Sequence, residues 1–185
     1  MSYRPRILVL PFSAVIIVGL VAYKLSQLPP SKDENNPEER RAARPFLALD
    51  SQNRLLKFER YLGRQEVLLI FFDGEAGADR DPLLFRARQH FKQLQQRRIV
   101  VIAISTALPQ HNRQAAARGG AFPFPLLSDP ELLIHKDWGR YDEDQQRPLT
   151  GVFRIDRAGQ VAWSGKSPRP EERLDEILPP LNAAN

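Results

Sequence analysis

Cysteine is absent from this chain of 185 residues. A disulfide, a thiolate metal site and a thiol nucleophile all require that side chain, so this chain alone supplies none of the three. The absence does not identify a cellular compartment, because a chain without cysteine is compatible with any of them. Thiol chemistry is therefore the first class of function that the sequence excludes.

Strong charge of one sign is missing from the larger part of the chain. The whole sequence has a net charge of +5, but residues 46–185 hold 20 basic and 18 acidic side chains. Domains that bind nucleic acid concentrate positive charge on one surface or stripe. This balance therefore gives no reason to expect a nucleic acid as partner.

A nucleophile is missing from the stretch where a site is most expected. Residues 67–72 (VLLIFF) form an unbroken apolar run, which predicts a strand buried on both faces of a parallel sheet. In open α/β sheets, functional sites lie beyond the carboxyl ends of such strands. The loop at that place, residues 73–82, contains no Cys, Ser or His.

What the sequence does contain begins with an apolar, uncharged run of 17 residues at positions 7–23. Its length predicts an uncleaved transmembrane anchor over residues 7–26, after a short basic tail at residues 1–6. A cleaved signal peptide is the alternative, although no small-x-small cleavage site follows the run. Arg4 and Arg6 favour an N-terminus inside, so we expect a single-pass membrane protein whose domain is extracytoplasmic.

Residues 27–45 combine prolines with charges of both signs, a composition typical of a flexible polar linker. A folded domain is expected over residues 46–185. Apolar runs and turn signals predict strands at residues 46–49, 55–56, 67–72, 99–104, 150–155 and 161–164. Periodic patterns predict helices at residues 83–96, 109–118, 130–138 and 170–178. This order predicts a mixed sheet flanked by helices, the thioredoxin type of α/β fold.

Three segments resemble the peroxiredoxins, the alkyl hydroperoxide reductase and thiol-specific antioxidant (AhpC/TSA) family. Residues 125–129 (PLLSD) with residues 135–139 (HKDWG) are similar to the family's "PLLSD…KDYG" stretch. Residues 151–161 (GVFRIDRAGQV) resemble its "GLFIID–G–V" hairpin, and the run at 67–72 resembles its catalytic strand. The resemblance covers roughly residues 46–178 and implies a peroxiredoxin-type, thioredoxin-like fold.

The resemblance does not extend to the catalytic residues. The family carries a Pro-x-x-x-Thr-x-x-Cys motif after the central strand, and its three named positions fall on Asp73, Gly77 and Arg80. The family's arginine, just before the hairpin glycine, falls on Thr150. A slip of one or two residues brings in neither sulfur nor a hydroxyl group. Peroxide reduction needs a thiolate, so the sequence favours a relative that is not an enzyme and holds no cofactor.

Other chemistry in the same loop has weak support. Four carboxylates within nine residues are of the type that binds hard cations, but their spacing does not match an EF-hand, and a solvated acidic loop is the ordinary explanation. They are Asp73, Glu75, Asp79 and Asp81. The three histidines fall on different predicted elements without ligand spacing, and each is interpreted as a surface or structural residue. They are His90, His111 and His135.

The remaining hypothesis is an interaction or assembly module, because function lives in sites rather than in folds. It predicts a protein partner such as a membrane complex, and by family analogy a homodimer is an option. The candidate contact residues are Arg80, Arg86, Phe122, Phe124 and Trp163. Core packing is the competing explanation for the aromatic residues. The alternative function is a redox or antioxidant-related protein that works with cysteines or cofactors of a partner.

Overall fold

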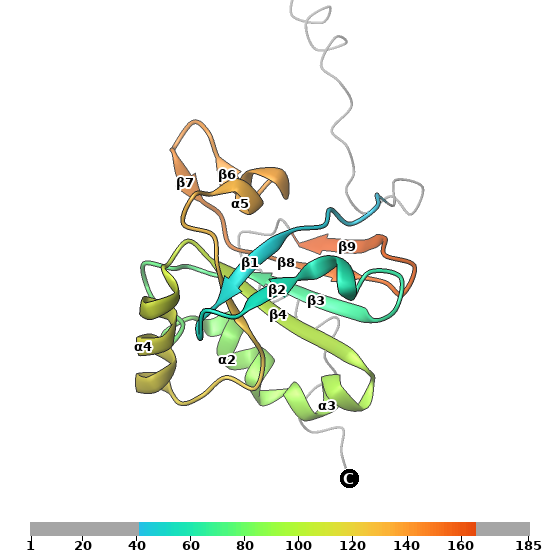
Figure 1. The fold of residues 1–185 in the computed structure, drawn as a ribbon, viewed down its shortest axis with the longest axis horizontal. Helices are drawn as coiled ribbons and strands as arrows, with labels where there is room; N and C mark the ends of the chain where they lie inside the picture. Colours follow the sequence, from blue (N-terminus) through green and yellow to red (C-terminus); the bar gives the residue numbers. More distant parts are fainter. Residues whose placement is uncertain (1–40, 166–185) are drawn as a thin grey trace, which may run out of the picture. The chain divides into compact units, whose positions relative to one another are not determined.

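A seven-stranded mixed sheet in the order β2-β1-β5-β4-β3-β8-β9 organises the protein (Figure 1). The computed structural model describes residues 41–165, with side chains up to residue 162. The central strands β3 (Glu66–Phe71), β4 (Ile99–Ser105) and β5 (Leu126–Ser128) are parallel to one another, and β1 and β8 join them in antiparallel pairs. This arrangement confirms the expected mixed α/β sheet.

The strand β3 separates two apolar layers because successive side chains point to opposite faces. Leu68 and Ile70 pack with the helices α2 (Pro82–Gln89) and α3 (Phe91–Gln96). Leu69 and Phe71 pack on the other face, where Trp138 joins them. The strand is buried on both faces, as its unbroken apolar run predicts.

The hairpin of β1 (Leu47–Asp50) and β2 (Leu55–Lys57) matches the expected pair, and the 3-10 turn η2 (Phe58–Arg60) follows it. Asp50 holds the hairpin turn, since its carboxylate accepts the backbone N–H groups of Gln52 and Arg54 at 2.8 and 2.9 Å. The C-terminal hairpin of β8 (Gly151–Ile155) and β9 (Val161–Gly165) is also confirmed.

The single helix predicted over residues 83–96 is wrong, because the chain forms α2 and α3 with a break at His90. The backbone there has φ −92° and ψ 3°, outside the helical region. The imidazole of His90 is buried, and its Nδ1 lies 3.0 Å from Oε1 of Gln93 in α3. Residues 83–96 contain neither glycine nor proline. The buried imidazole, which bonds forward into α3, therefore accounts for the break.

The helix α4 (Pro109–Gly119) is confirmed, with proline at its start and Gly120 at φ 85° after its end. The helix predicted over residues 130–138 shortens to α5 (Leu133–Asp137), because Leu132 is left-handed at φ 61°. After α5 the chain forms the short antiparallel pair β6 (Tyr141–Asp142) and β7 (Arg147–Pro148), with Glu143 and Asp144 exposed between the two strands.

The tail and anchor at residues 1–26, nearly all of the linker and the helix predicted over residues 170–178 lie outside the described residues. Within residues 41–165, no helix has the length and apolar character needed to cross a membrane.

Candidate functional site

The loop between β3 and α2 ends in a buried carboxylate at the start of the helix. Asp81 precedes Pro82, and its Oδ1 accepts the backbone N–H of Leu84 at 3.0 Å. Its Oδ2 accepts the N–H of Asp73 across the loop at 3.3 Å. Asp81 therefore caps the helix and closes the loop on itself, because both carboxylate oxygens bond to backbone within this segment.

Burial raises the pKa of Asp81, because the charged form loses water that the protein replaces only in part. The backbone hydrogen bond from Leu84 is the strongest of the effects that act in the opposite direction. The balance leaves a carboxyl group at the helix N-terminus whose pKa lies above its ordinary value of 3.8. Perturbed carboxyls of this kind occur both at functional sites and at structural caps.

A cleft of about 520 Å³ opens beside this loop, beyond the carboxyl ends of β3 and β4. The loop contributes Arg80, and the start and end of α4 contribute His111 and Arg118. Thr106, at the end of β4, also lines the cleft. The position of the cleft agrees with the rule for open α/β sheets.

Charge in the cleft is divided between a paired and an unpaired guanidinium group. Arg118 Nε donates to Asp79 Oδ2 at 3.0 Å, and this hydrogen bond lowers the pKa of Asp79 and raises that of Arg118. Arg80 is exposed and has no ion pair within residues 41–165. Of the two arginines that line the cleft, Arg80 is therefore the one that is open to a ligand or partner.

The four carboxylates of the loop do not come together as a cation site. Asp73 accepts the N–H of Glu75 at 2.8 Å in a local turn, and Asp79 and Asp81 have the partners given above. Among residues 41–165, no three histidine, aspartate or glutamate side chains lie close enough to hold a metal ion. Glu75 is exposed.

A buried polar network lies behind the cleft, which one of its members, Asn112, lines. Asn112 of α4 accepts the hydroxyl of Ser105 at 3.2 Å and donates to the carbonyl of Leu127 at 3.3 Å and the hydroxyl of Ser128 at 3.2 Å. Each member of the network has partners in the protein, so the network fixes α4 against β4 and β5. It contains no histidine or carboxylate that could activate Ser105 as a nucleophile.

The histidines lie apart from one another. His135 is buried, and its Nδ1 and backbone N–H lie 2.7 and 2.8 Å from the same oxygen of Asp129. The ring also packs edge-to-face on Phe71, with centroids 5.0 Å apart. His135 and Asp129 thus anchor α5 to the end of β5, while His90 lies between α2 and α3 and His111 at the cleft.

The four positions that align with the family's catalytic residues, although none carries the family's residue, lie at the carboxyl end of β3. Asp73, Gly77 and Arg80 share the loop after β3, and the register that pairs Phe71 with Gly151 brings Thr150 next to that loop. Thr150 is exposed, and its carbonyl accepts Nη1 of Arg140 at 3.5 Å. Counting along the motif places the family's cysteine at the exposed Arg80. The residue that caps the helix is the next one, Asp81.

The remaining candidate contact residues have different surroundings. Phe124 is buried in the core, and Phe122 lies 5.6 Å from it with the Arg88 guanidinium 5.1 Å from its own ring. Arg86 is half-buried in the last turn of α2. Trp163 lies in β9 opposite Arg154, and its side chain falls outside the described residues. Core packing therefore explains Phe124, while Phe122 is half-buried.

The sequence pattern did not identify Asp81 as a cap or Arg118 as a lining residue. An aspartate immediately before a proline is a recognisable start of a helix, so this signal was available at Asp81. Arg118 approaches the loop only through the packing of α4, across 39 residues of sequence from Asp79. No local pattern reports such a contact.

Comparison with known proteins gives a consistent result. A family model described as AhpC/TSA family matches residues 40–164. Alkyl hydroperoxide reductase E of Mycobacterium bovis is 28% identical over 135 residues, which cover 72% of this chain and 87% of that protein. The protein of the same name from Mycobacterium tuberculosis matches to the same extent.

Solved structures agree in fold. Enterococcus faecalis AhpC superposes with a TM-score of 0.61 at 18% identity, covering 75% of this chain and 89% of that one. The mitochondrial 2-Cys peroxiredoxin of Plasmodium falciparum gives 0.60 at 20% identity, covering 74% and 90%. At these identities the likeness shows a shared peroxiredoxin-like fold.

Proposed function

This chain belongs to the AhpC/TSA family, and we propose that it acts as a binding module with no thiol peroxidase chemistry of its own. The observation that carries the proposal is the Asp81 cap at the start of α2 in a chain that contains no cysteine. The family resemblance calls for a reactive thiol at Arg80, and the carboxylate of the next residue, Asp81, forms hydrogen bonds within the chain at the helix start.

The physical reason lies in the N-terminus of α2. A helix N-terminus stabilises an anion through its free N–H groups, and in thiol enzymes this effect lowers the pKa of a cysteine. Here the N–H of Leu84 is already bonded to Asp81, within the chain. The electrostatic feature that would activate a nucleophile stabilises the fold instead.

The cleft beside the loop is the proposed contact surface. Arg80 is exposed and without an ion pair in residues 41–165, and a guanidinium group binds a carboxylate of a partner in a two-pronged geometry. The anchor expected at residues 7–26 would hold this surface near a membrane, with the domain outside the cytoplasm. The partner is then a protein of a membrane complex, and the module can act as a homodimer.

Affinity capture from native membranes in mild detergent tests the proposal. The wild-type chain is expected to retain a stoichiometric protein partner. Arg80→Glu should lose it, whereas Arg113→Glu, an exposed position of α4 outside the cleft, should keep it. A wild-type chain that retains no protein but carries a tightly bound small molecule or metal would overturn the proposal.

The alternative, a redox protein that uses the cysteines of a partner, shares the same family fold. It predicts that the captured complex consumes peroxide and that alkylation of the partner's thiols stops this consumption. The binding-module proposal predicts that peroxide consumption does not depend on the presence of this chain.

A further inference from the structure

The outward face of the β1–β2 hairpin reverses the usual pattern of a sheet exposed to water. Leu49 pairs with Leu55 across the two strands, and Leu47 pairs with Lys57. Since side chains alternate along a strand, these four share one face. An antiparallel pair with one solvent-exposed face normally carries polar side chains on that face. Here three of the four side chains on the face are leucines.

These leucines are exposed to solvent. Leu47 is 60% exposed, Leu49 41% and Leu55 57%, while the inward-facing Ala48 is buried. Single exposed leucines need no explanation, but three on adjacent positions form a contiguous apolar patch. Such patches mark interaction surfaces.

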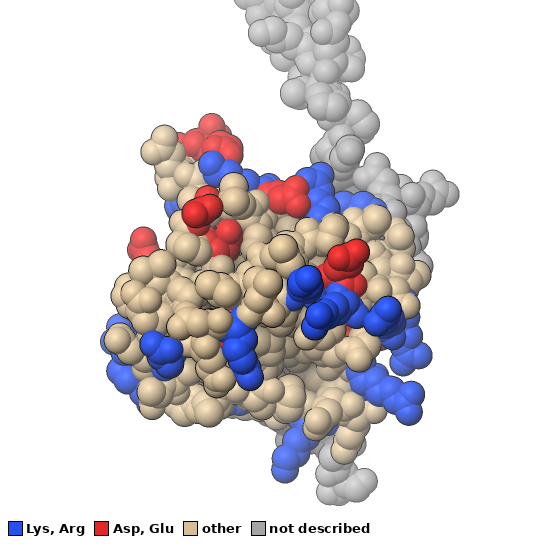
Figure 2. All heavy atoms as spheres, in the orientation of Figure 1, with Lys and Arg blue, Asp and Glu red and all other residues tan. Residues whose placement is uncertain are grey.

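Basic side chains border this patch. Lys57 is part of the face, and Arg60 follows it in η2; neither has an ion pair within residues 41–165. Asp50, the acidic residue of β1, is buried and paired with Arg54, and Glu59 is the other acidic residue between 47 and 64. Figure 2 shows the face that carries β1 and β2. Most of its acidic side chains lie in the upper half of the view, and basic side chains extend into the lower half.

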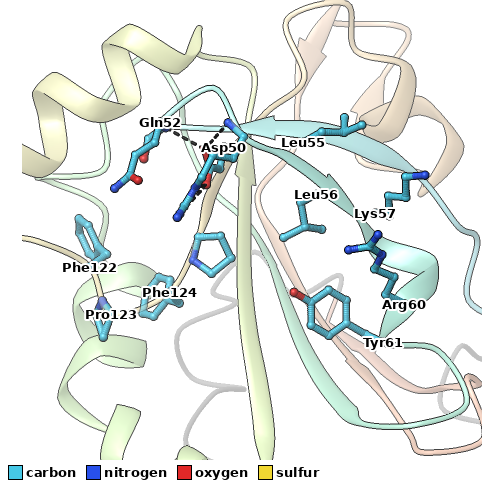
Figure 3. Close-up of a pocket in the computed structure, with 13 residues that line it drawn as sticks. Asp50, Gln52, Leu55, Leu56, Lys57, Arg60, Tyr61, Phe122, Pro123 and Phe124 are labelled. Carbon is cyan, nitrogen blue, oxygen red and sulfur yellow. Dashed lines mark hydrogen bonds and ion pairs between the residues drawn. The ribbon is translucent and has the colours of Figure 1, made fainter.

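A groove of about 590 Å³ runs beside the hairpin. Leu56 and Tyr61 lie on one side of it, and Phe122 and Phe124 lie on the other, with Arg60 near Tyr61 (Figure 3). Apolar and polar side chains thus share its walls, and its rim on the β2 side is basic. A negatively charged head group with an apolar tail matches this combination.

We propose that the β1–β2 hairpin and this groove dock on an anionic lipid surface, with the leucines in the apolar boundary and Lys57 and Arg60 at the phosphates. The inference rests on the membrane tether of the proposed function. The part of the expected linker that precedes the described residues, 27 to 40, would have a root-mean-square span of about 20 Å. That span keeps the hairpin at high effective concentration near the bilayer.

The absence of cysteine makes a direct test possible, because a single introduced cysteine is a unique labelling site. The full chain with Leu55→Cys carries a nitroxide label and is reconstituted in nanodiscs of phosphatidylcholine, with or without phosphatidylglycerol. Asp144→Cys, at an exposed position between β6 and β7, is the matched control. Accessibility of the label to oxygen and to a water-soluble relaxation agent measures its depth.

The proposal predicts that the label at position 55 enters the lipid in discs with phosphatidylglycerol and that the label at 144 stays in water. Lys57→Glu and Arg60→Glu should each reduce the docked population about fivefold or more, and high salt should reduce it too. A chain held in the disc whose label at 55 stays in water overturns lipid docking but leaves the tether intact.

A chain that does not remain with the discs overturns both the tether and the docking. The label at position 55 could instead become inaccessible only when a membrane protein is added, and equally in discs without anionic lipid. That result would assign the face to a protein partner and overturn the lipid proposal.

Discussion

The carboxylate of Asp81 accepts the backbone N–H of Leu84 at 3.0 Å and so begins α2 with a buried acidic group. This contact joins the loop after the central strand to the first helix of the domain. It also fills the position at which an external or reactive anion would be stabilised.

Replacement of Asp81 separates its capping role from its charge. Asp81→Ala should lower the free energy of unfolding by about 0.5–2 kcal/mol, because the N–H of Leu84 loses its acceptor. Asp81→Asn should retain most of this stability, since an amide oxygen caps equally well. Chemical denaturation followed by circular dichroism measures both. Equal stability of the alanine variant and the wild type would show that the cap is dispensable.

The difference in stability between the wild type and Asp81→Asn should change with pH in a defined direction. Burial raises the pKa of Asp81 above 3.8 in the folded state, so the folded chain binds this proton more tightly than the unfolded chain. The contribution of Asp81 to stability is therefore largest at low pH and declines as pH rises from 3.8 through the folded pKa. The stability of Asp81→Asn relative to wild type should rise over this interval. A relative stability that falls instead would contradict the raised pKa.

The pair Asp79–Arg118 should behave in the opposite way. The hydrogen bond from Arg118 lowers the pKa of Asp79, so its contribution to stability is present above 3.8 and is lost as pH falls through the folded pKa. In Arg118→Gln, an NMR titration should show the pKa of Asp79 moving up toward 3.8. Arg113→Gln, an exposed position on the same helix, should leave it unchanged. An unchanged pKa in Arg118→Gln would exclude the hydrogen bond as its cause.

Gly119 provides a test of the contact between α4 and the loop. A Cβ at this position would lie 2.8 Å from Cβ of Asp79 and 2.9 Å from its Cα, closer than real contacts allow. Although alanine is a better helix former than glycine, Gly119→Ala should destabilise the fold by about 1–3 kcal/mol. Thermal unfolding measures the change, and stabilisation by the alanine would show that the loop can move away.

The buried pair of Asp129 and His135 should be strongly coupled. Asp129→Ala removes the hydrogen-bond partner of both Nδ1 and the backbone N–H of His135 and should destabilise the chain by about 1–3 kcal/mol for each buried group left unpaired. Adding His135→Leu should recover part of this loss, because the double variant no longer buries an imidazole without its partner. Denaturation of the two single variants and the double variant gives the coupling energy. Additive effects would mean that the two side chains stabilise the fold independently.

The continuous apolar strands were predictable from sequence because a strand that is buried on both faces needs apolar residues at successive positions. Residues 67–72 and 99–104 were expected as strands, and the structure places β3 and β4 there with shifts of one residue. The C-terminal hairpin was predictable for a similar reason, since its turn at residues 156–159 lies between two alternating stretches. Local patterns suffice where an element determines its own environment.

Elements fixed by tertiary contacts were not predictable. The strand β5 has only three residues, and one of its two partners, β1, is remote from it in sequence. The break at His90 depends on the burial of one imidazole. The cleft depends on the approach of Arg118 to Asp79 and on the packing of Asn112. The loop of the site was therefore predictable from sequence, whereas the opposite wall, which α4 forms, was not.

The most direct test of the central claim is the peroxide consumption of variants that reintroduce the thiol. Arg80→Cys and Asp81→Cys, each combined with Thr150→Arg, place a cysteine and an arginine at the edge of the sheet where the family motif falls. Hydrogen peroxide consumption in the presence of a thiol reductant is compared with that of the unmodified chain. A site rebuilt for binding predicts that neither double variant exceeds the rate of free thiol. Catalytic turnover by either variant would contradict the account, because it would show that the peroxide pocket survives.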